Sequence, residues 1–357
     1  MATGNGDGDR AATSVGDADK AQPRGNSVAV PLFDIGTTTS IDHTENENTA
    51  LSLETAKDLV SALRDSGFAL VRSPLLTKDL QSRSLEAAGR FLAESSNVSD
   101  NGNAAKPNTK TPGVDVIPHP TDPKVYAMLD SEDQYDLVAP DTNIIKEYVC
   151  ALRSIKMDVL RLIATGLGMN DVDFFAKLHD EDNDTLRLIT YFPTRSETTG
   201  NRCKEHSDYG TITLLSTDGV SGLELFHEGK WLPVPYVEGS LVVNVGSLLA
   251  RWTNGALRAT LHRVAGPGSL NSGSHRQVLV EATKHSRTSI AFFADPNRNV
   301  SESLAATTAA EKDALTITGA LGGMSVAEYI RWRSGGDGVE RNGVSFTSEE
   351  SETITKK

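Results

Sequence analysis

The sequence predicts a mainly β protein with flanking helices, in which residues 185–300 form a double-sheet barrel. From Thr185 onwards, short segments rich in β-branched and aromatic residues alternate with turns of Gly, Pro and Asn, which is typical of such a barrel. Before Thr185, three segments carry apolar residues at helical spacing, so each predicted helix has one face to bury. Hydrophobic residues make up 38% of the 357, which is enough for a real core.

The first predicted elements are two strands with a helix between them. Residues 28–35, with the sequence VAVPLFDI, predict a short opening strand. Apolar side chains recur every three or four residues from Leu51 to Ser66, which predicts a helix that Gly67 ends. The apolar run from Phe68 to Val71 predicts the next strand.

Three further helices are predicted, at Thr77 to Ala93, Asn143 to Gly166 and Ser325 to Arg333. Thr77 can cap the first of them by accepting a hydrogen bond from a backbone N–H. The second carries an apolar stripe and is interpreted as a scaffold helix packed against the sheet. Between these two, residues 95–141 hold a cluster of prolines, so we expect no regular element there and interpret the segment as mobile or as a functional lid.

We expect one folded domain between two disordered tails, because both ends of the chain are polar and lack large apolar side chains. The tails are residues 1–27 and 336–357; the domain, residues 28–335, divides into a helical N-terminal portion (28–184), the barrel core (185–300) and a C-terminal helical portion (301–335).

Charge and cysteine content restrict the partners and the compartment. Lys and Arg number 35 against 48 Asp and Glu, a net charge of −13, and no basic run occurs, which argues against nucleic acid or an anionic membrane as the partner. The sequence contains no apolar stretch of membrane-spanning length and no signal-peptide pattern. Only Cys150 and Cys203 occur, which argues against a disulfide framework, so we expect a cytoplasmic protein.

The candidate metal ligands are His206, Asp208 and His262. His206 and Asp208 are two residues apart, so on an extended backbone their side chains leave the same face. His262 lies in a strand-like run and is the best third ligand. Two imidazoles and one carboxylate suit non-haem Fe(II) and leave coordination positions open for substrate and dioxygen. An HxD pair alone is weak evidence, because a chain with eight histidines and many Asp contains one easily by chance.

The segments around these residues strengthen the assignment. In chain order they are LRLITYFP from Leu186, HSDYGTITLL from His206, GKWLPVP from Gly229, LVVNVGS from Leu241, RWTNG from Arg251, HRV from His262 and RTSIAFF from Arg287. In order and approximate spacing this set resembles the isopenicillin-N-synthase-like branch of the 2-oxoglutarate- and Fe(II)-dependent oxygenases. The resemblance covers the C-terminal half strongly and residues 28–93 more loosely. It implies that the barrel is a double-stranded β-helix, or jelly roll, with helices on one side.

Arg287 and Ser289 form an Arg-x-Ser pair that resembles the family's clamp for the co-substrate 2-oxoglutarate. A guanidinium can hold the distal carboxylate through two hydrogen bonds, and a hydroxyl two residues later on a strand faces the same way. Tyr191 falls where the family has a Tyr that could be a third donor. The Asn that often stands two residues before this Tyr is replaced by Ile189.

The resemblance implies Fe(II), 2-oxoglutarate and O2 as cofactor and co-substrates, with no catalytic residue beyond the metal ligands. The implied reaction couples decarboxylation of 2-oxoglutarate to hydroxylation, desaturation or oxidative cyclisation at an unactivated C–H bond. We expect a monomer that acts on a small molecule of specialised metabolism, with an amino acid derivative as the guess from family habit. The candidate substrate contacts are Tyr209, Phe293, Tyr329 and Trp332.

Three other interpretations stay open. The first is an oxidase of the same fold that uses Fe(II) and O2 without a 2-oxo acid, because Ser247 replaces a more frequent Asp. The second is a non-catalytic protein that binds iron or 2-oxoglutarate. The third is a zinc hydrolase, since zinc also accepts His and Asp, but the clamp would then have no role. The histidines without partners at suitable spacing are predicted to be surface residues: His179, His227, His275 and His285.

Overall fold

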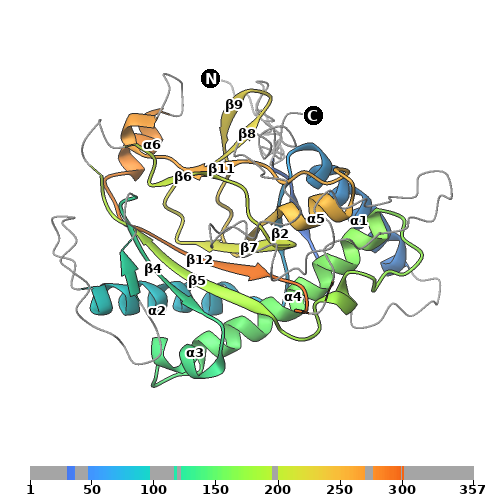
Figure 1. Cartoon of the computed structure of the whole chain (residues 1–357), viewed down its shortest axis with the longest axis horizontal. Helices are drawn as coiled ribbons and strands as arrows, with labels where there is room; N and C mark the ends of the chain where they lie inside the picture. The colour runs from blue at the N-terminus through green and yellow to red at the C-terminus, as the bar shows by residue number, and fades with distance from the viewer. Residues whose placement is uncertain are drawn as a thin grey trace, which may run out of the picture.

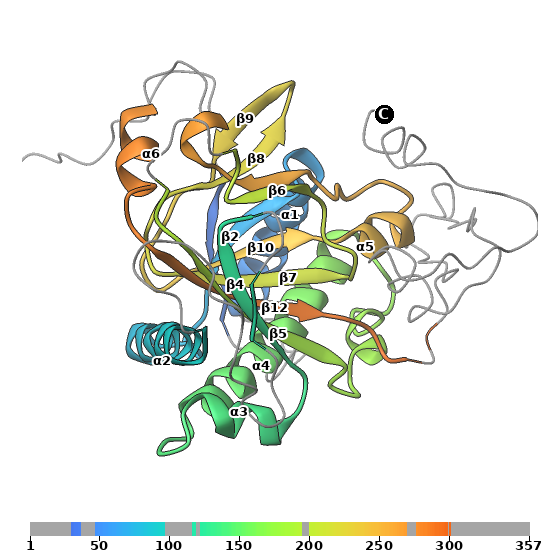
Figure 2. The ribbon, with the colours of Figure 1, turned by 60° about the vertical axis from the view of Figure 1, so that its left-hand side comes forward.

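The computed structural model describes residues 30–36, 47–96, 116–118, 122–194, 200–269, 276–298 and 300. Two β-sheets face each other, and helices cover the outer side of the larger sheet (Figure 1, Figure 2). This arrangement confirms the predicted double-stranded β-helix core with flanking helices. No helix in the described ranges combines the length and the apolar character that a membrane span requires.

The larger sheet has eight strands, and all neighbours pair antiparallel except β1 and β2. Its order across the sheet is β1 (Leu32–Asp34), β2 (Phe68–Arg72), β10 (Leu241–Val245), β7 (Ile212–Thr217), β12 (Arg287–Ala294), β5 (Asp184–Tyr191), β4 (Lys124–Leu129) and β3 (Val116–Pro118). The smaller sheet is antiparallel throughout, in the order β6 (Cys203–His206), β11 (His262–Val264), β8 (Leu223–His227) and β9 (Lys230–Pro233).

The described helices and 3-10 turns are α1 (Glu47–Asp65), α2 (Lys78–Ser96), α3 (Glu132–Val138), α4 (Ile144–Gly166), η1 (Ala176–Leu178), α5 (Ser247–Trp252), η2 (Pro267–Ser269) and α6 (Arg276–Ala282). Three of the described helices, α1, α2 and α4, lie where the apolar spacing predicted them, and the shorter helices and 3-10 turns were not predicted. Figure 1 shows α2, α3 and α4 on the side of the large sheet away from β6, β8, β9 and β11. The hydroxyl of Thr77 accepts the Leu80 N–H at 3.1 Å, which confirms the predicted cap of α2.

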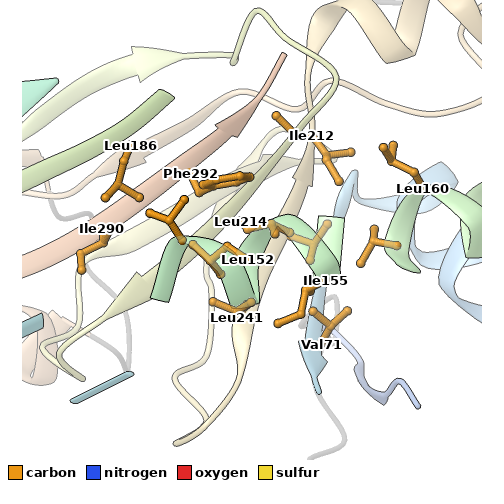
Figure 3. Packing of buried hydrophobic residues seen from close by; sticks show 14 of the residues in the cluster. Val71, Leu152, Ile155, Leu160, Leu186, Ile212, Leu214, Leu241, Ile290 and Phe292 are labelled. Atoms are coloured by element: carbon orange, nitrogen blue, oxygen red, sulfur yellow. The ribbon is translucent and has the colours of Figure 1, made fainter. Parts of the chain in front are cut away.

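The main core fills the space between α4 and the outer face of the large sheet. Leu152 and Ile155 of α4 pack there with Leu214, Leu241 and Phe292, all buried (Figure 3). Because side chains alternate along a strand, a strand that buries one row under the helices turns the other row toward the small sheet. The large sheet therefore separates the hydrophobic core from the space between the two sheets.

The prediction that residues 95–141 contain no regular element was wrong. β4 and α3 form within this segment, and β3 pairs with β4. Val125, Ala127 and Leu129 alternate as buried residues, and β4 completes the backbone hydrogen bonds along β5. The prolines cluster just before this strand and so do not interrupt it. Residues 97–115 and 119–121 lie outside the described residues, as do both predicted tails and the portion 301–335.

Candidate active site

The three candidate metal ligands meet between the two sheets. His206 ends β6 and His262 begins β11, and the two residues are paired in register, with their ring centroids 4.3 Å apart. Asp208 lies two residues after His206, in the connection to β7. Its Oδ1 is 3.7 Å from the Nε2 atom of each histidine, and the three ligand atoms all lie within 4.8 Å of one another. A metal ion can therefore be reached by all three at once.

Hydrogen bonds behind the two imidazoles turn their Nε2 atoms toward this centre. Nδ1 of His206 lies 2.8 Å from the Lys204 carbonyl, and Nδ1 of His262 lies 3.1 Å from the Thr260 carbonyl. A carbonyl can only accept, so Nδ1 of each ring carries a proton and Nε2 is the atom left to bind a cation. Against the effect of burial, Cys203 and Asp208 raise the pKa of His206 to about 9, so its Nε2 must lose a proton when a cation binds. Burial, helped by the neighbouring His206, lowers the pKa of His262 to about 4, which keeps that ring neutral at pH 7.

Asp208 is held by its other carboxylate oxygen. Oδ2 accepts hydrogen bonds from the Thr213 hydroxyl at 2.6 Å and from the Asn244 side-chain amide at 2.7 Å. Burial opposes ionisation, but the two histidines and these two hydrogen bonds outweigh it and hold the pKa of Asp208 below its usual range. The carboxylate is therefore charged and oriented, with Oδ1 directed at the site where a cation would sit.

The loop that carries Asp208 rests on the start of α5. The Asp208 carbonyl accepts hydrogen bonds from the Ser247 N–H at 2.8 Å and the Ser247 hydroxyl at 2.9 Å. Gly246 packs against Gly210 so closely that a Cβ on Gly246 would overlap the Gly210 carbonyl. Ser247, whose identity raised the oxidase alternative, thus helps to position the loop that carries Asp208.

The residues of the predicted clamp also come together. Arg287 is buried on β12 and pairs in register with Tyr191 of β5, and its guanidinium carbon lies 5.2 Å from the centre of the Tyr191 ring. Its Nε donates to the Val220 carbonyl at 3.1 Å. The hydroxyl of Ser289 is fully buried and has no hydrogen-bond partner within the described part of the chain. A buried hydroxyl without a partner is costly, so this position fits a ligand that accepts its hydrogen bond.

One cavity connects the metal ligands with the clamp. Its walls include His206, Asp208, His262, Arg287, Ser289, Tyr191, Phe68, Lys124, Arg187, Ile189 and Phe293. Phe293, a predicted substrate contact, lines this cavity, whereas Tyr209 is not among the lining residues. The other two predicted contacts, Tyr329 and Trp332, lie outside the described residues.

The sequence reasoning missed two further buried cations near the clamp. Arg202 is fully buried, donates to the His285 carbonyl at 2.9 Å and leaves Nε and one terminal nitrogen without a partner among the described residues. Burial and the neighbouring Arg287 lower its pKa to about 10. Lys124 is buried with Nζ 3.0 Å from both Asp122 and Cys203. Lys124 was missed because its segment was interpreted as irregular, although the alternation of Val125, Ala127 and Leu129 was a usable signal.

Two of the histidines predicted at the surface are buried instead. The ring of His179 lies 2.7 Å from the Phe175 carbonyl through Nδ1 and 2.9 Å from the Thr211 hydroxyl through Nε2. His227 is buried on β8, His285 is exposed as predicted, and His275 lies outside the described residues. The prediction for His179 failed because one of its partners is a backbone carbonyl four residues earlier and the other, Thr211, is brought beside it only by the fold.

Part of this chain matches a known protein family and several curated proteins. Residues 183–296 match the model of the 2OG-Fe(II) oxygenase superfamily. Proline hydroxylase buaE of Petromyces alliaceus is 38% identical over 157 residues, which are 42% of this chain and 46% of that protein. The 2-oxoglutarate-dependent dioxygenase ecdK of Aspergillus rugulosus is 35% identical over 42% of this chain and 45% of its own length. The chain thus spans about half the length of the curated relatives it matches.

Solved structures extend the likeness of the fold over most of the chain. A full-length Neurospora crassa protein in complex with alpha-KG and thymine has a TM-score of 0.64 at 24% identity, covering 88% of this chain and 98% of that one. The dioxygenase for auxin oxidation 1 of Arabidopsis thaliana, with 2-oxoglutarate, has a TM-score of 0.56 at 20% identity, covering 76% and 94%. At these identities the likeness establishes the architecture.

Proposed function

We propose that this chain, whose residues 183–296 match the 2OG-Fe(II) oxygenase superfamily, is a 2-oxoglutarate-dependent dioxygenase acting on an unactivated C–H bond of a small molecule. The observation that carries the proposal is the buried Ser289 hydroxyl, unpartnered among the described residues, beside Arg287 and in the same cavity as a His-Asp-His cluster. A zinc hydrolase or a simple iron-binding protein would have no use for this clamp.

Each side chain has a defined role in the proposal. His206, Asp208 and His262 would hold Fe(II) through Nε2, Oδ1 and Nε2, the atoms that converge in the cavity. The bound metal would supply activation of O2 together with oxidative decarboxylation of 2-oxoglutarate to succinate and CO2. Arg287 would bind the distal carboxylate of 2-oxoglutarate, and Ser289 would donate its hydroxyl to it.

Other residues would orient these groups and keep water out. Thr213 and Asn244 fix the Asp208 carboxylate so that only Oδ1 faces the cation. Tyr191 lies over the Arg287 guanidinium and limits its movement. Apolar side chains complete the cavity wall, with Phe68 edge-on to the His262 ring at 5.5 Å between ring centroids. Such walls exclude water from a reactive site and strengthen the electrostatic interactions inside it.

The substrate class is proposed from the relatives. The relative buaE is named a proline hydroxylase, and the relative ecdK is named a 2-oxoglutarate-dependent dioxygenase. We therefore infer an amino acid or amino acid derivative of specialised metabolism as the substrate.

We also propose a monomer, and the low cysteine content supports a cytoplasmic location. Ser247, whose identity raised the oxidase alternative, hydrogen-bonds to the Asp208 backbone, and the titration with 2-oxoglutarate separates the two functions.

The test is an anaerobic titration of metal-free protein with Fe(II) and then with 2-oxoglutarate. We expect the weak visible charge-transfer band of a chelated keto acid in the wild type and its loss in His262→Ala. Loss of one partner of a buried charge pair costs about 2–5 kcal/mol, so Arg287→Ala should weaken 2-oxoglutarate binding roughly 30-fold to several thousand-fold.

Arg83→Ala is the matched control, because Arg83 is exposed on α2 and pairs with Asp79 in the adjacent turn. It should titrate like the wild type. Fe(II) binding without any band, or an Arg287→Ala variant with unchanged affinity for 2-oxoglutarate, would refute the proposed co-substrate and favour the oxidase.

A further inference from the structure

Arg187 is a second guanidinium in the cavity wall, on a different strand from Arg287. It lies on β5 and alternates with Ile189 and Tyr191, so all three side chains leave the cavity-facing side of the strand. Its guanidinium carbon is 4.2 Å from the centre of the Tyr126 ring on β4. Its Nε is buried and has no hydrogen-bond partner among the described residues. The side chain is thus held in place by an aromatic ring, and its Nε lacks an acceptor in this part of the chain.

The charges of the cavity do not balance without an additional anion. Lys124 is neutralised by Asp122 at 3.0 Å. A bound Fe(II) and Arg287 together carry three positive charges, and Asp208 with a bound 2-oxoglutarate dianion carries three negative ones. Arg187 remains as an uncompensated positive charge among the lining residues. Arg202, which does not line the cavity, only adds to the positive charge.

The position of Arg187 separates it from the clamp. In the ladder between β5 and β12, Arg287 stands opposite Tyr191, whereas Arg187 stands opposite Ala291, four residues further along. At about 3.4 Å per residue the two backbone positions are about 14 Å apart along the sheet. The two guanidiniums also stack on different rings, Arg187 on Tyr126 and Arg287 on Tyr191. This geometry favours two separate anions.

We propose that Arg187 binds a carboxylate of the primary substrate, so that the substrate is an organic acid whose oxidised carbon lies away from its carboxylate. The inference rests on the proposed function, because the 2-oxoglutarate clamp accounts for the other guanidinium. A planar fork fixed over a ring loses little freedom on binding and can hold a carboxylate through two hydrogen bonds. Tyr126 positions that fork, and β4 and β5 form the wall that selects the substrate.

The experiment uses the protein loaded anaerobically with Fe(II) and 2-oxoglutarate, whose charge-transfer band responds when a substrate binds near the metal. The probes are the free proteinogenic amino acids, phenylacetate and octanoate, each beside its primary amide, which keeps the shape and removes the negative charge. We expect at least one acid to perturb the band while its amide at the same concentration does not. In Arg187→Gln the dissociation constant of that acid should rise roughly 30-fold or more, with 2-oxoglutarate affinity unchanged.

Two further variants make the outcome specific. Arg187→Lys keeps the charge without the fork and should recover part of the affinity for the acid. Arg83→Gln, on the exposed face of α2, should behave like the wild type. The inference is overturned if no acid perturbs the band, if acid and amide bind alike, or if Arg187→Gln binds the acid normally. It is also overturned if Arg187→Gln loses 2-oxoglutarate affinity or the band itself. Absence of the band in the wild type would instead refute the proposed function.

Discussion

At the scale of single residues, the orientation of Asp208 depends on two hydrogen bonds to the oxygen that faces away from the metal position. Thr213→Val removes the shorter of them with little change in shape and leaves Oδ2 under-satisfied in a buried site. Residues that orient a metal ligand typically contribute about 10–100-fold to metal affinity. We expect a loss of Fe(II) affinity in that range, measured by anaerobic competition with a chelator. Thr165→Val on α4 is the control, and equal affinities in the two variants would contradict this role.

The buried His179 makes a prediction about pH and stability. Burial lowers its pKa to about 4 from 6.5, so the folded state disfavours the protonated ring. A group whose folded pKa is depressed binds fewer protons when folded, so its stabilising effect is complete above pH 6.5 and declines as the pH falls toward 4. For this shift the loss at pH 5 is about 2 kcal/mol.

The measurement is urea unfolding of the metal-free protein at pH 7 and pH 5. His179→Gln should be less stable at pH 7, and its stability should change less between the two pH values than that of the wild type. His285→Gln provides the control, because His285 is exposed. If the free energy of unfolding of His179→Gln falls between pH 7 and pH 5 as much as that of the wild type, groups other than His179 cause the loss of stability.

The residues that the sequence could predict are those whose signal is local. His206 and Asp208 were paired by their spacing of two, and Arg287 with Ser289 by the same rule, and the structure brings both pairs into one cavity. Thr213, Asn244 and Arg187 could not be assigned in this way. Their roles arise from strand order and register, since β7, β10 and β5 are far apart in sequence but lie in one sheet.

At the scale of elements, the start of α5 and the Asp208 loop form one unit around two glycines. A Cβ at Gly246 would overlap the Gly210 carbonyl, so Gly246→Ala must push the loop and α5 apart. Overpacking of this kind costs about 1–3 kcal/mol. We expect a lower melting temperature together with weaker Fe(II) binding.

Gly200→Ala is the matched control for this prediction, because a Cβ there would meet no atom within 4 Å. It should retain the stability and the Fe(II) affinity of the wild type. A Gly246→Ala variant that loses stability but binds Fe(II) normally would show that α5 does not position Asp208.

Elements with strong periodicity were predicted best. The helices α1, α2 and α4 and the strand β2 lie within a few residues of their predicted bounds. β4 and α3 were missed, because their short signals lie beside a cluster of prolines. A short strand gains much of its stability from the strands it pairs with, here β5 and β3, and those neighbours are not visible in the local sequence.

At the scale of the whole molecule, metal binding should couple to folding, because the ligands come from β6, β11 and the loop before β7. A metal that binds only the folded state adds about 2.7 kcal/mol at a concentration of 100 times its Kd. Anaerobic addition of Mn(II), an ion with similar ligand preferences, should raise the melting temperature by several degrees. Chelation should reverse the effect, and His262→Ala should not respond. An equal shift in that variant would place the ion elsewhere.

The proposed iron ligands and the proposed substrate-binding arginine belong to different strands. The proposed iron ligands and their supports belong to β6, β11, β7 and β10, whereas Lys124, Tyr126 and Arg187 belong to β4 and β5. A substitution on the second pair of strands leaves the contacts of Asp208 with Thr213, Asn244 and the two histidines intact. Descendants of such a protein can therefore acquire new substrates by changing Tyr126 and Arg187 while inheriting the residues that hold the iron and 2-oxoglutarate.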